Sequence, residues 1–225
     1  MPQRLNKYIA TNLGISRREA DDLISAGQVF INGHPAVLGA RVEESAKVLV
    51  KGKTVQPTTM VCLTLNKPPG YVSSRRAQST TPTLYELLPP EFQTLKTVGR
   101  LDKDSSGLIL LTNNGDFAFT MTHPKFHKTK IYTVTLDHPL EPLHQQTISD
   151  SGVTLTDGSS KFTLTSLDAS RKNWQVQLTE GRNRQIRRTF GALGYTVTKL
   201  HRTNFGNYAL GDLKSGEWSE IEVRT

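Results

Sequence analysis

One stretch near the middle of the chain, Val98-Gly99-Arg100-Leu101-Asp102-Lys103-Asp104-Ser105-Ser106-Gly107, is a polar turn that leads into an apolar run at 108–111. The run consists of Leu and Ile residues, which predicts a buried strand. Two carboxylates, Asp102 and Asp104, therefore stand on a loop next to a rigid element that can position them. This arrangement makes them candidates for chemistry.

Several interpretations of the turn compete on the residues alone. Asp102, Asp104, Ser106 and Gly107 match the early positions of an EF-hand calcium loop, but Asn113 stands where that loop requires a bidentate glutamate. A phosphotransfer aspartate would normally follow a hydrophobic strand, whereas Gly99 and Arg100 precede Asp102, and the sequence has no P-loop. A metal-dependent phosphoesterase that uses Asp102 and Asp104 is a further alternative. The simplest alternative is a hairpin turn with solvated carboxylates.

Short strands dominate residues 61–225. Segments rich in Val, Ile, Leu, Thr and aromatic residues lie at 61–65, 108–112, 130–136, 174–178 and 195–200, with turn residues between them. Apolar side chains alternate at 132, 134 and 136 and again at 174, 176 and 178, so each set shares one face of its strand. We predict an α+β domain on a largely antiparallel mixed sheet with flanking helices.

The clearest helical stretch of this domain lies in a basic segment. Residues 171–202 carry eight Lys or Arg against one acidic residue, Glu180, a net charge of +7. Asn183 is positioned to cap a helix that ends near Gly194. At the helical period, the apolar residues at 186, 190 and 193 form its buried stripe.

The arginines of this helix differ in direction. Arg184 and Arg188 project away from the apolar stripe, toward solvent or phosphate groups. Arg187 lies at the boundary of the stripe, where its planar guanidinium could enter a cleft and hold a carboxylate bidentately. The alternative is three arginines on a solvated helix face.

Residues 1–51 form a separate pattern of two helices followed by a hairpin. Ser16 and Glu19 make a capping box for the second helix, and Asn32-Gly33 is a hairpin turn pair. Residues 52–60 are polar and lack periodicity, which predicts a linker. The catalytic candidates then fall in a second domain at 61–225.

The first unit resembles the S4-type RNA-binding domain. The resemblance rests on an ordered set of segments: Arg4-Leu5-Asn6-Lys7-Tyr8-Ile9, Ser16-Arg17-Arg18-Glu19-Ala20 and Gly27-Gln28-Val29-Phe30-Ile31-Asn32-Gly33. Its cations Arg4, Lys7, Arg17 and Arg18 suit phosphate groups if they share one surface of the two helices. The alternative is a solvated polar face.

Composition narrows the class of protein. The 225 residues contain 28 Lys plus Arg against 20 Asp plus Glu, a net charge of +8, which favours an acidic partner. With one cysteine, Cys62, the chain has neither an intrachain disulfide nor a multi-cysteine zinc site. His123 and His127 are poor metal ligands because Pro124 prevents the helix that would align them. No apolar run approaches a membrane span and no signal-peptide core is present, so we expect a cytoplasmic protein without membrane contact.

Four motifs, taken in order, resemble the pseudouridine synthases that modify bacterial ribosomal RNA. They are Leu65-Asn66-Lys67-Pro68-Pro69-Gly70, the stretch from Gly99 to Leu108, Lys130-Ile131-Tyr132, and Glu180-Gly181-Arg182-Asn183-Arg184-Gln185-Ile186-Arg187-Arg188. The match spans essentially the whole chain. The Gly-Arg-Leu-Asp motif is specific when Arg-Gln-Ile-Arg follows it, as it does here.

The resemblance implies a role for each matching residue. Asp102 would be the essential catalytic carboxylate, Tyr132 would pack on the uracil, and Arg187 would form an ion pair with Asp102. Leu200 would line the base pocket, and Arg100 would also bind substrate. Outside the pocket, we expect Arg182, Arg184 and Arg188 to bind RNA together with the four cations of the S4-like unit.

The implied reaction needs no cofactor and no metal. Uridine becomes pseudouridine when the bond from ribose C1′ to N1 breaks, the base rotates and C1′ joins C5. One ionised carboxylate could attack the sugar as a nucleophile or remove a ribose proton to give a glycal-like intermediate. The sequence is compatible with both routes. The uridine must also leave its stack, and stacking on Tyr132 could offset part of that cost.

The leading hypothesis is therefore a monomeric enzyme that isomerises uridine in ribosomal RNA or an assembling ribosomal subunit. We favour the large subunit, because Arg-Gln-Ile-Arg at Arg187, Leu111-Thr112-Asn113-Asn114-Gly115 and Gly216-Glu217-Trp218 look more like large-subunit members. The compact chain with an S4-type unit is similar to the small-subunit enzyme instead. A non-catalytic RNA-binding or ribosome-assembly protein with the same fold is the other alternative.

Overall fold

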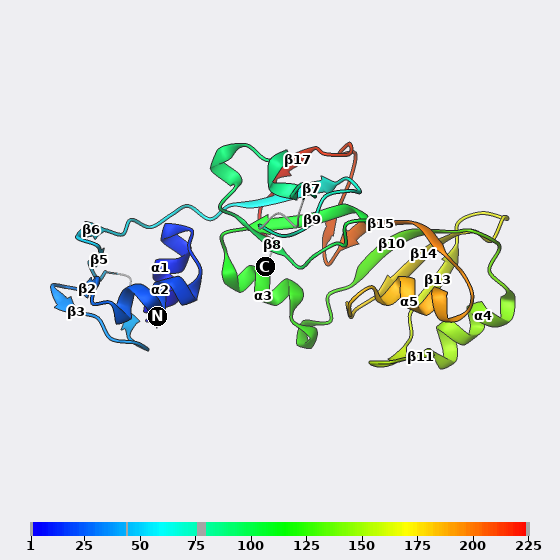
Figure 1. Ribbon diagram of the computed structural model, residues 1–225, viewed down its shortest axis with the longest axis horizontal. Coiled ribbons are helices and arrows are strands. Elements are labelled where there is room, and N and C mark those ends of the chain that lie inside the picture. The colour runs from blue at the N-terminus through cyan, green and yellow to red at the C-terminus, as the bar shows by residue number, and fades with distance from the viewer. Residues whose placement is uncertain (1, 44, 76–79, 224–225) are drawn as a thin grey trace. The chain divides into compact units, whose positions relative to one another are not determined.

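A computed structural model describes residues 2–43, 45–75 and 80–223 (Figure 1). The chain divides into two compact units. The smaller unit comprises residues 1–61 with the short segments 94–96 and 113–115, and the larger unit comprises the rest. None of the described helices is long and apolar enough to cross a lipid bilayer.

The smaller unit has the predicted helices and hairpin. Its helices are α1 Leu5–Leu13 and α2 Arg17–Ser25, and its strands are β1 Gln3–Arg4, β2 Val29–Ile31, β3 His34–Pro35, β4 Arg41–Val42, β5 Val48–Val50 and β6 Lys53–Thr54. Ser16 and Glu19 form the expected capping box, in which each side chain bonds to the other residue's backbone N–H. Apolar residues of both helices and of β2, β4 and β5 share one core.

The predicted linker begins too early. Strand β6 pairs with β5 through Leu49 opposite Thr54, and Val55 is buried in the core of the smaller unit. Residues 52–60 look like a linker in sequence because the segment is short, polar and without periodicity. Pairing with an existing strand, which a single-sequence pattern does not reveal, adds them to the first domain.

The larger unit is built on one mixed sheet, in the strand order β13-β14-β10-β15-β9-β7-β17, with β16 paired to β15 and β8 to β9. The strands are β7 Cys62–Lys67, β8 Lys96–Val98, β9 Ser106–Thr112, β10 Lys130–Leu136, β13 Thr163–Ser166, β14 Asn173–Leu178, β15 Val197–Phe205, β16 Tyr208–Ala209 and β17 Trp218–Glu220. The sheet is largely antiparallel, which confirms the predicted class, and the alternating apolar residues of β10 and β14 are buried.

One parallel pair, β9 with β15, joins the two halves of this sheet and fixes the position of the Asp102 loop. Gly107 on β9 lies opposite Arg202 on β15. Its φ is +103°, and a Cβ at Gly107 would stand 2.2 Å from the carbonyl oxygen of Arg202. Only glycine permits this approach, so Gly107 sets where the chain leaves the loop and enters the sheet.

Helices and one hairpin flank the sheet. They are α3 Gly115–Thr122, α4 Pro142–Gln146 and α5 Gln185–Ala192, with the short turns η1 Leu84–Leu87, η2 Pro90–Phe92, η3 Pro124–Phe126 and η4 Thr147–Ser151, and a hairpin of β11 Val153–Leu155 and β12 Gly158–Ser160. Helix α5 packs its buried Phe190 against Phe162, which precedes β13.

Helix α5 begins one residue later than predicted. Its N-cap is Arg184, with φ +46°, rather than Asn183, and no side chain caps the helix. Of the predicted stripe, Ile186 and Phe190 are buried and Leu193 is half-buried. Because Arg184 lies outside the helix in a left-handed conformation, positions counted from Asn183 do not describe where its side chain points.

Candidate active site

The loop that carries Asp102 runs from the end of β8 to the start of β9, and its backbone is held on both sides of the aspartate. On the N-terminal side, the Ser73 hydroxyl donates to the Leu101 carbonyl at 2.8 Å and accepts from the Leu101 N–H at 3.1 Å. On the C-terminal side, the Gly70 N–H donates to the Lys103 carbonyl at 2.7 Å. The loop is therefore fixed before any ligand binds.

Lys67 anchors the same loop from inside the domain. Its side chain is fully buried, and its ammonium donates to the carbonyls of Ser105, at 2.7 Å, and Pro68, at 2.9 Å. Burial lowers the pKa of Lys67 from 10.5 to about 8, and the nearby charges of Asp102 and Asp104 partly oppose that shift. The motif around Lys67 thus supports the loop instead of contacting the proposed base.

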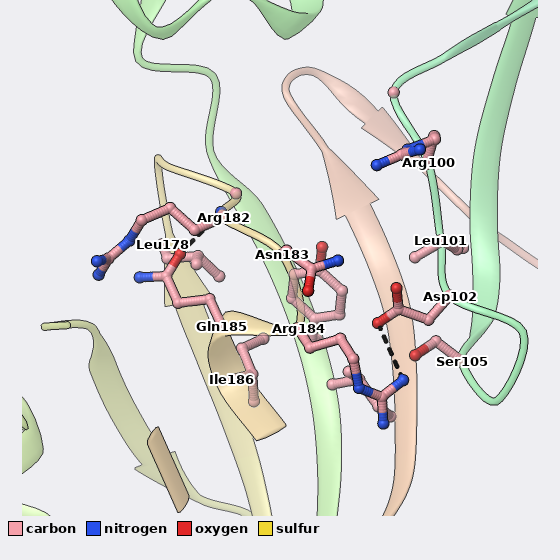
Figure 2. Close-up of a pocket in the computed structure, with 14 residues that line it drawn as sticks. Arg100, Leu101, Asp102, Ser105, Leu178, Arg182, Asn183, Arg184, Gln185 and Ile186 are labelled. Carbon is pink, nitrogen blue, oxygen red and sulfur yellow. Dashed lines mark hydrogen bonds and ion pairs between the residues drawn. The ribbon is translucent and has the colours of Figure 1, made fainter. Parts of the chain in front are cut away.

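Asp102 lies at a cavity of about 280 Å³ (Figure 2). Three segments form its wall: the loop 99–105, the stretch from Gly181 to Ile186, and the sheet residues Tyr132, Leu178 and Leu200. The Asp102 side chain is about one-third exposed. The cavity therefore combines a reachable carboxylate with an apolar floor.

Tyr132 and Leu200 belong to that floor, as the sequence predicted. Tyr132 is buried on β10, and its cross-strand partner on β15 is Arg202. The neighbouring register pair, Val134 with Leu200, places Leu200 on the same side of the sheet. Arg100 also lines the cavity and is exposed, and Figure 2 shows its side chain near the rim beside Leu101.

Arg184, rather than Arg187, is the arginine that reaches Asp102. A guanidinium nitrogen of Arg184 lies 3.7 Å from an oxygen of Asp102, the pair joined in Figure 2. The same guanidinium holds both oxygens of Asp104, at 3.0 and 2.9 Å. This hydrogen bonding lowers the pKa of Asp104. Arg184 is exposed, in line with its predicted direction, but its guanidinium is held by the Asp102 loop and is not left free for phosphate groups.

Arg187 pairs with a different carboxylate from the one predicted. Its Nε lies 3.3 Å from Asp104, and its terminal nitrogens donate to the carbonyls of Val197 at 2.6 Å and Asp104 at 3.1 Å. Its side chain is 12% exposed, and burial lowers its pKa from the ordinary arginine value. The expected ion pair of Arg187 with Asp102 is therefore replaced by a pair with Asp104. Arg187 packs beneath the loop and braces it.

Arg182 and Arg188 are also engaged within the chain. Arg188 holds both oxygens of Asp157 at 3.0 and 2.7 Å, and Arg182 donates to the same carboxylate at 3.0 Å. Asp157 lies at the turn of the β11–β12 hairpin. Both arginines were predicted to bind RNA, and their partner Asp157 was not predicted because no motif surrounds it.

Most of the cations that were predicted to bind RNA in the smaller unit are exposed to solvent. Arg4, Arg17 and Arg18 are exposed, and Lys7 is half-buried. Their proposed role in RNA binding stays a prediction.

The arrangement favours acid–base or nucleophilic chemistry by one carboxylate. Asp104 is neutralised by two arginines, which leaves it poorly placed to share a metal with Asp102. Among the described residues, no group of three or more His, Cys, Asp and Glu side chains is arranged to hold a metal ion. The family resemblance assigns no role to Asp104, whereas in the structure Asp104 pairs with both Arg184 and Arg187.

Comparison with known proteins identifies the family. A model of RNA pseudouridylate synthases matches residues 61–192, and a model of the S4 domain matches residues 3–48. Ribosomal large subunit pseudouridine synthase B of Bacillus subtilis is 36% identical over 227 residues, covering 97% of this chain and 92% of that protein. Ribosomal small subunit pseudouridine synthase A of Pasteurella multocida is 33% identical over 224 residues, covering 98% and 96%.

A solved structure agrees with these matches. The crystal structure of a pseudouridylate synthase superposes with a TM-score of 0.70 at 31% sequence identity and covers 97% of this chain and 96% of that one. Because the family model spans more than half of the chain and relatives match along nearly their whole length, this protein belongs to the RNA pseudouridylate synthase family and carries an N-terminal S4 domain.

Proposed function

We propose that this protein isomerises uridine to pseudouridine in ribosomal RNA, with Asp102 as the catalytic carboxylate. The observation that carries the proposal is the position of Asp102: a partly exposed carboxylate on a braced loop, at a cavity whose floor is Tyr132 and Leu200. This is the geometry that a flipped-out base requires, with an apolar surface for the ring and a reactive group at its edge.

The reaction balances without an added reagent. The C1′–N1 bond breaks, C1′ joins C5, the proton on C5 is lost and N1 gains a proton. Asp102 either attacks the ribose and leaves again, or removes a ribose proton and returns it. Both routes use one carboxylate.

The surrounding residues have supporting roles in this proposal. Stacking of the uracil on Tyr132 contributes roughly 1–3 kcal/mol toward the cost of removing the base from its stack. Leu200 shapes the apolar floor, and Arg100 at the rim binds the substrate strand. Arg184 and Arg187 act through Asp104 to keep the loop and its charges in place.

For the substrate we propose large-subunit ribosomal RNA, free or in an assembling particle, bound through the S4 domain. The motifs around Arg187, at 111–115 and at 216–218 support the large subunit, although relatives named for each subunit match this chain. We further propose that the protein acts as a monomer. Its compartment would be the cytoplasm.

The test is a map of pseudouridines in ribosomal RNA from cells with and without this gene. We expect one or a few sites in large-subunit RNA to disappear with the gene and to return with a wild-type copy. Sites lost from small-subunit RNA would move the proposal to the other subunit. An unchanged map, together with RNA binding by the purified protein, would favour a non-catalytic RNA-binding protein.

A further inference from the structure

A second cavity adjoins the Asp102 cavity in the larger unit. It has a volume of about 320 Å³ and shares four wall residues with the first: Gly99, Arg100, Gly181 and Arg182. The rest of its wall comes from the segment around Pro124, from β10 at Lys130, from the turn 179–180 and from β15 at Arg202 and Phe205. None of the proposed catalytic steps uses Lys130 or Arg202.

Arg202 is buried in this wall with unused hydrogen-bonding capacity. Its side chain is 2% exposed, and its Nε donates to the Leu108 carbonyl at 2.7 Å. One terminal nitrogen reaches only the Tyr132 hydroxyl, at 3.5 Å, and the other has no hydrogen-bond partner. A buried guanidinium N–H without an acceptor is unusual, and it indicates that an acceptor is supplied from outside the chain.

Lys130 places a second cation at the same cavity. Among the described residues, its ammonium donates hydrogen bonds to three backbone carbonyls, those of Lys128, Thr179 and Glu180, at 3.3 to 3.4 Å. Burial, followed by the charge of Arg202, lowers the pKa of Lys130 from 10.5 to about 8. Both cations lie over the face of Phe205, Lys130 at 5.2 Å and Arg202 at 4.9 Å from the ring centre.

The charges of the cavity do not balance within the chain. Of the described residues that line it, four are basic (Arg100, Lys130, Arg182, Arg202) and one, Glu180, is acidic; Arg182 is also paired with Asp157, which lies outside the cavity wall. Glu180 already accepts from Arg182, at 3.3 Å, and from Gln185. In the described part of the chain, no carboxylate lies within ion-pair distance of Lys130 or Arg202. The charge of Glu180 offsets the burial of Lys130 only in part, and desolvated cations without an ion-pair partner are costly, so the cavity is suited to an anion.

We propose that this cavity binds one phosphate of the RNA backbone beside the uridine, with Lys130 and Arg202 as its ligands. The inference rests on the proposed function and adds a subsite to it. A phosphate offers several oxygens to donors from different directions, as Lys130, Arg202 and the rim residue Arg100 require. The shared wall at Gly99 and Gly181 puts the phosphate next to the base cavity, and the contact of Arg202 with Tyr132 couples the two sites.

The test uses a synthetic RNA hairpin that contains the mapped uridine, in versions with a neutral methylphosphonate at one linkage at a time around it. Binding is measured with an Asp102→Asn background, so that no turnover intervenes. We expect one neutral linkage near the uridine to weaken binding about tenfold, the scale of a lost charge-assisted hydrogen bond. In the Lys130→Met variant, that linkage should cost no further affinity. Equal losses in both proteins at every linkage would overturn the proposal.

A matched variant and a small anion complete the test. Lys161→Met removes an exposed lysine of the same domain, whose ammonium donates to the Asp150 carbonyl, and should keep the full effect of the neutral linkage. Lys130→Met should flatten the dependence of log affinity on log salt by about 0.7, as for one phosphate of a single strand. Inorganic phosphate should compete with RNA for binding more strongly when the protein keeps Lys130 than when it carries Lys130→Met. Competition that is the same in both would exclude phosphate chemistry at this cavity.

The proposal can fail independently of the proposed function. If Asp102→Asn abolishes pseudouridine formation but Lys130→Met matches Lys161→Met in every binding measurement, the enzyme assignment stands and the phosphate site does not. The neutral linkage could instead weaken binding only for the protein that keeps Lys130, while the purified wild type forms no pseudouridine in the hairpin. The phosphate site would then stand and the proposed activity would fail.

Discussion

Arg184 holds both carboxylate oxygens of Asp104, at 3.0 and 2.9 Å, while one of its nitrogens lies 3.7 Å from Asp102. The aspartate two residues beyond the proposed catalytic group is thus the counter-charge that fixes the arginines of the site. Arg187 also pairs with this carboxylate, with its Nε 3.3 Å from Oδ2. The position of the Asp102 loop therefore depends on a group that does not itself touch the base cavity.

Asp104→Asn should lower turnover more than it lowers RNA affinity. Loss of the charge loosens Arg184 and Arg187 together, and displacement of a reactive group by about 1 Å can cost on the order of 100-fold in rate. We expect kcat to fall 10- to 100-fold with a KM within about threefold of wild type. Multiple-turnover assays over a range of RNA concentrations measure both constants. A variant with normal kcat and weakened binding would show that Asp104 serves RNA contact instead.

Asp157→Asn should change RNA affinity, in contrast to Asp104→Asn, which should mainly change turnover. It frees Arg182 and Arg188 from a carboxylate that neutralises them, so RNA binding should tighten a few-fold and its salt dependence should steepen. The pairs are largely at the surface, so thermal stability should change little. Titration of affinity against salt checks this. Weaker binding in Asp157→Asn would mean that the hairpin holds these arginines in their RNA-binding positions.

Gly107→Ala should destabilise the larger unit strongly. The new methyl group would meet the Arg202 carbonyl at 2.2 Å, on a backbone with φ +103° that alanine does not favour. We expect a loss above about 3 kcal/mol in the free energy of unfolding by urea. Gly191→Ala is the matched control, because it lies in α5 with no atom within 4 Å of the new Cβ and should be neutral or stabilising. Similar effects for the two would contradict the close approach of β9 and β15.

Burial of Lys67 should make the stability of the larger unit rise with pH. Its pKa is about 8 in the fold, against 10.5 in the ordinary state. Between these values the unfolded chain binds more protons than the folded one, so the contribution of Lys67 to stability rises with pH, by at most about 1.4 kcal/mol per unit. Urea unfolding of wild type and Lys67→Met between pH 7.5 and 10 measures the difference in slope. Lys161→Met should keep the wild-type slope; an identical slope in Lys67→Met would refute the assignment.

The strands of the larger unit were predictable because they carry period-two patterns, as in β10 and β14, or uninterrupted apolar runs, as in β9. Helix α3 and the β11–β12 hairpin were missed, since Gly115–Thr122 shows no clear apolar stripe and Thr154 to Ser160 is mostly polar. Their place is set by contacts with distant segments. The same holds for β6, which depends on pairing with β5.

The sequence predicted which residues line the candidate site better than it predicted which arginine pairs with which aspartate. The motifs put Asp102, Tyr132 and Leu200 at one cavity, and the structure has them there. The partner of Asp102 was misassigned because one left-handed residue, Arg184, precedes helix α5 and turns its own side chain to the loop. Arg202 was counted only as a charge in a basic segment, and its burial could not be read from that count.

Asp102→Asn should bind ribosomal RNA but form no pseudouridine. Purified wild type and variant are incubated with ribosomal RNA from cells that lack the gene, and modified uridines are mapped, with RNA affinity measured in parallel. The substitution keeps the shape of the side chain and removes its charge. We expect the RNA affinity of Asp102→Asn to stay within about threefold of wild type. No pseudouridine should be detectable, because one carboxylate carries the chemistry. Pseudouridine formation by Asp102→Asn at the wild-type rate would contradict it.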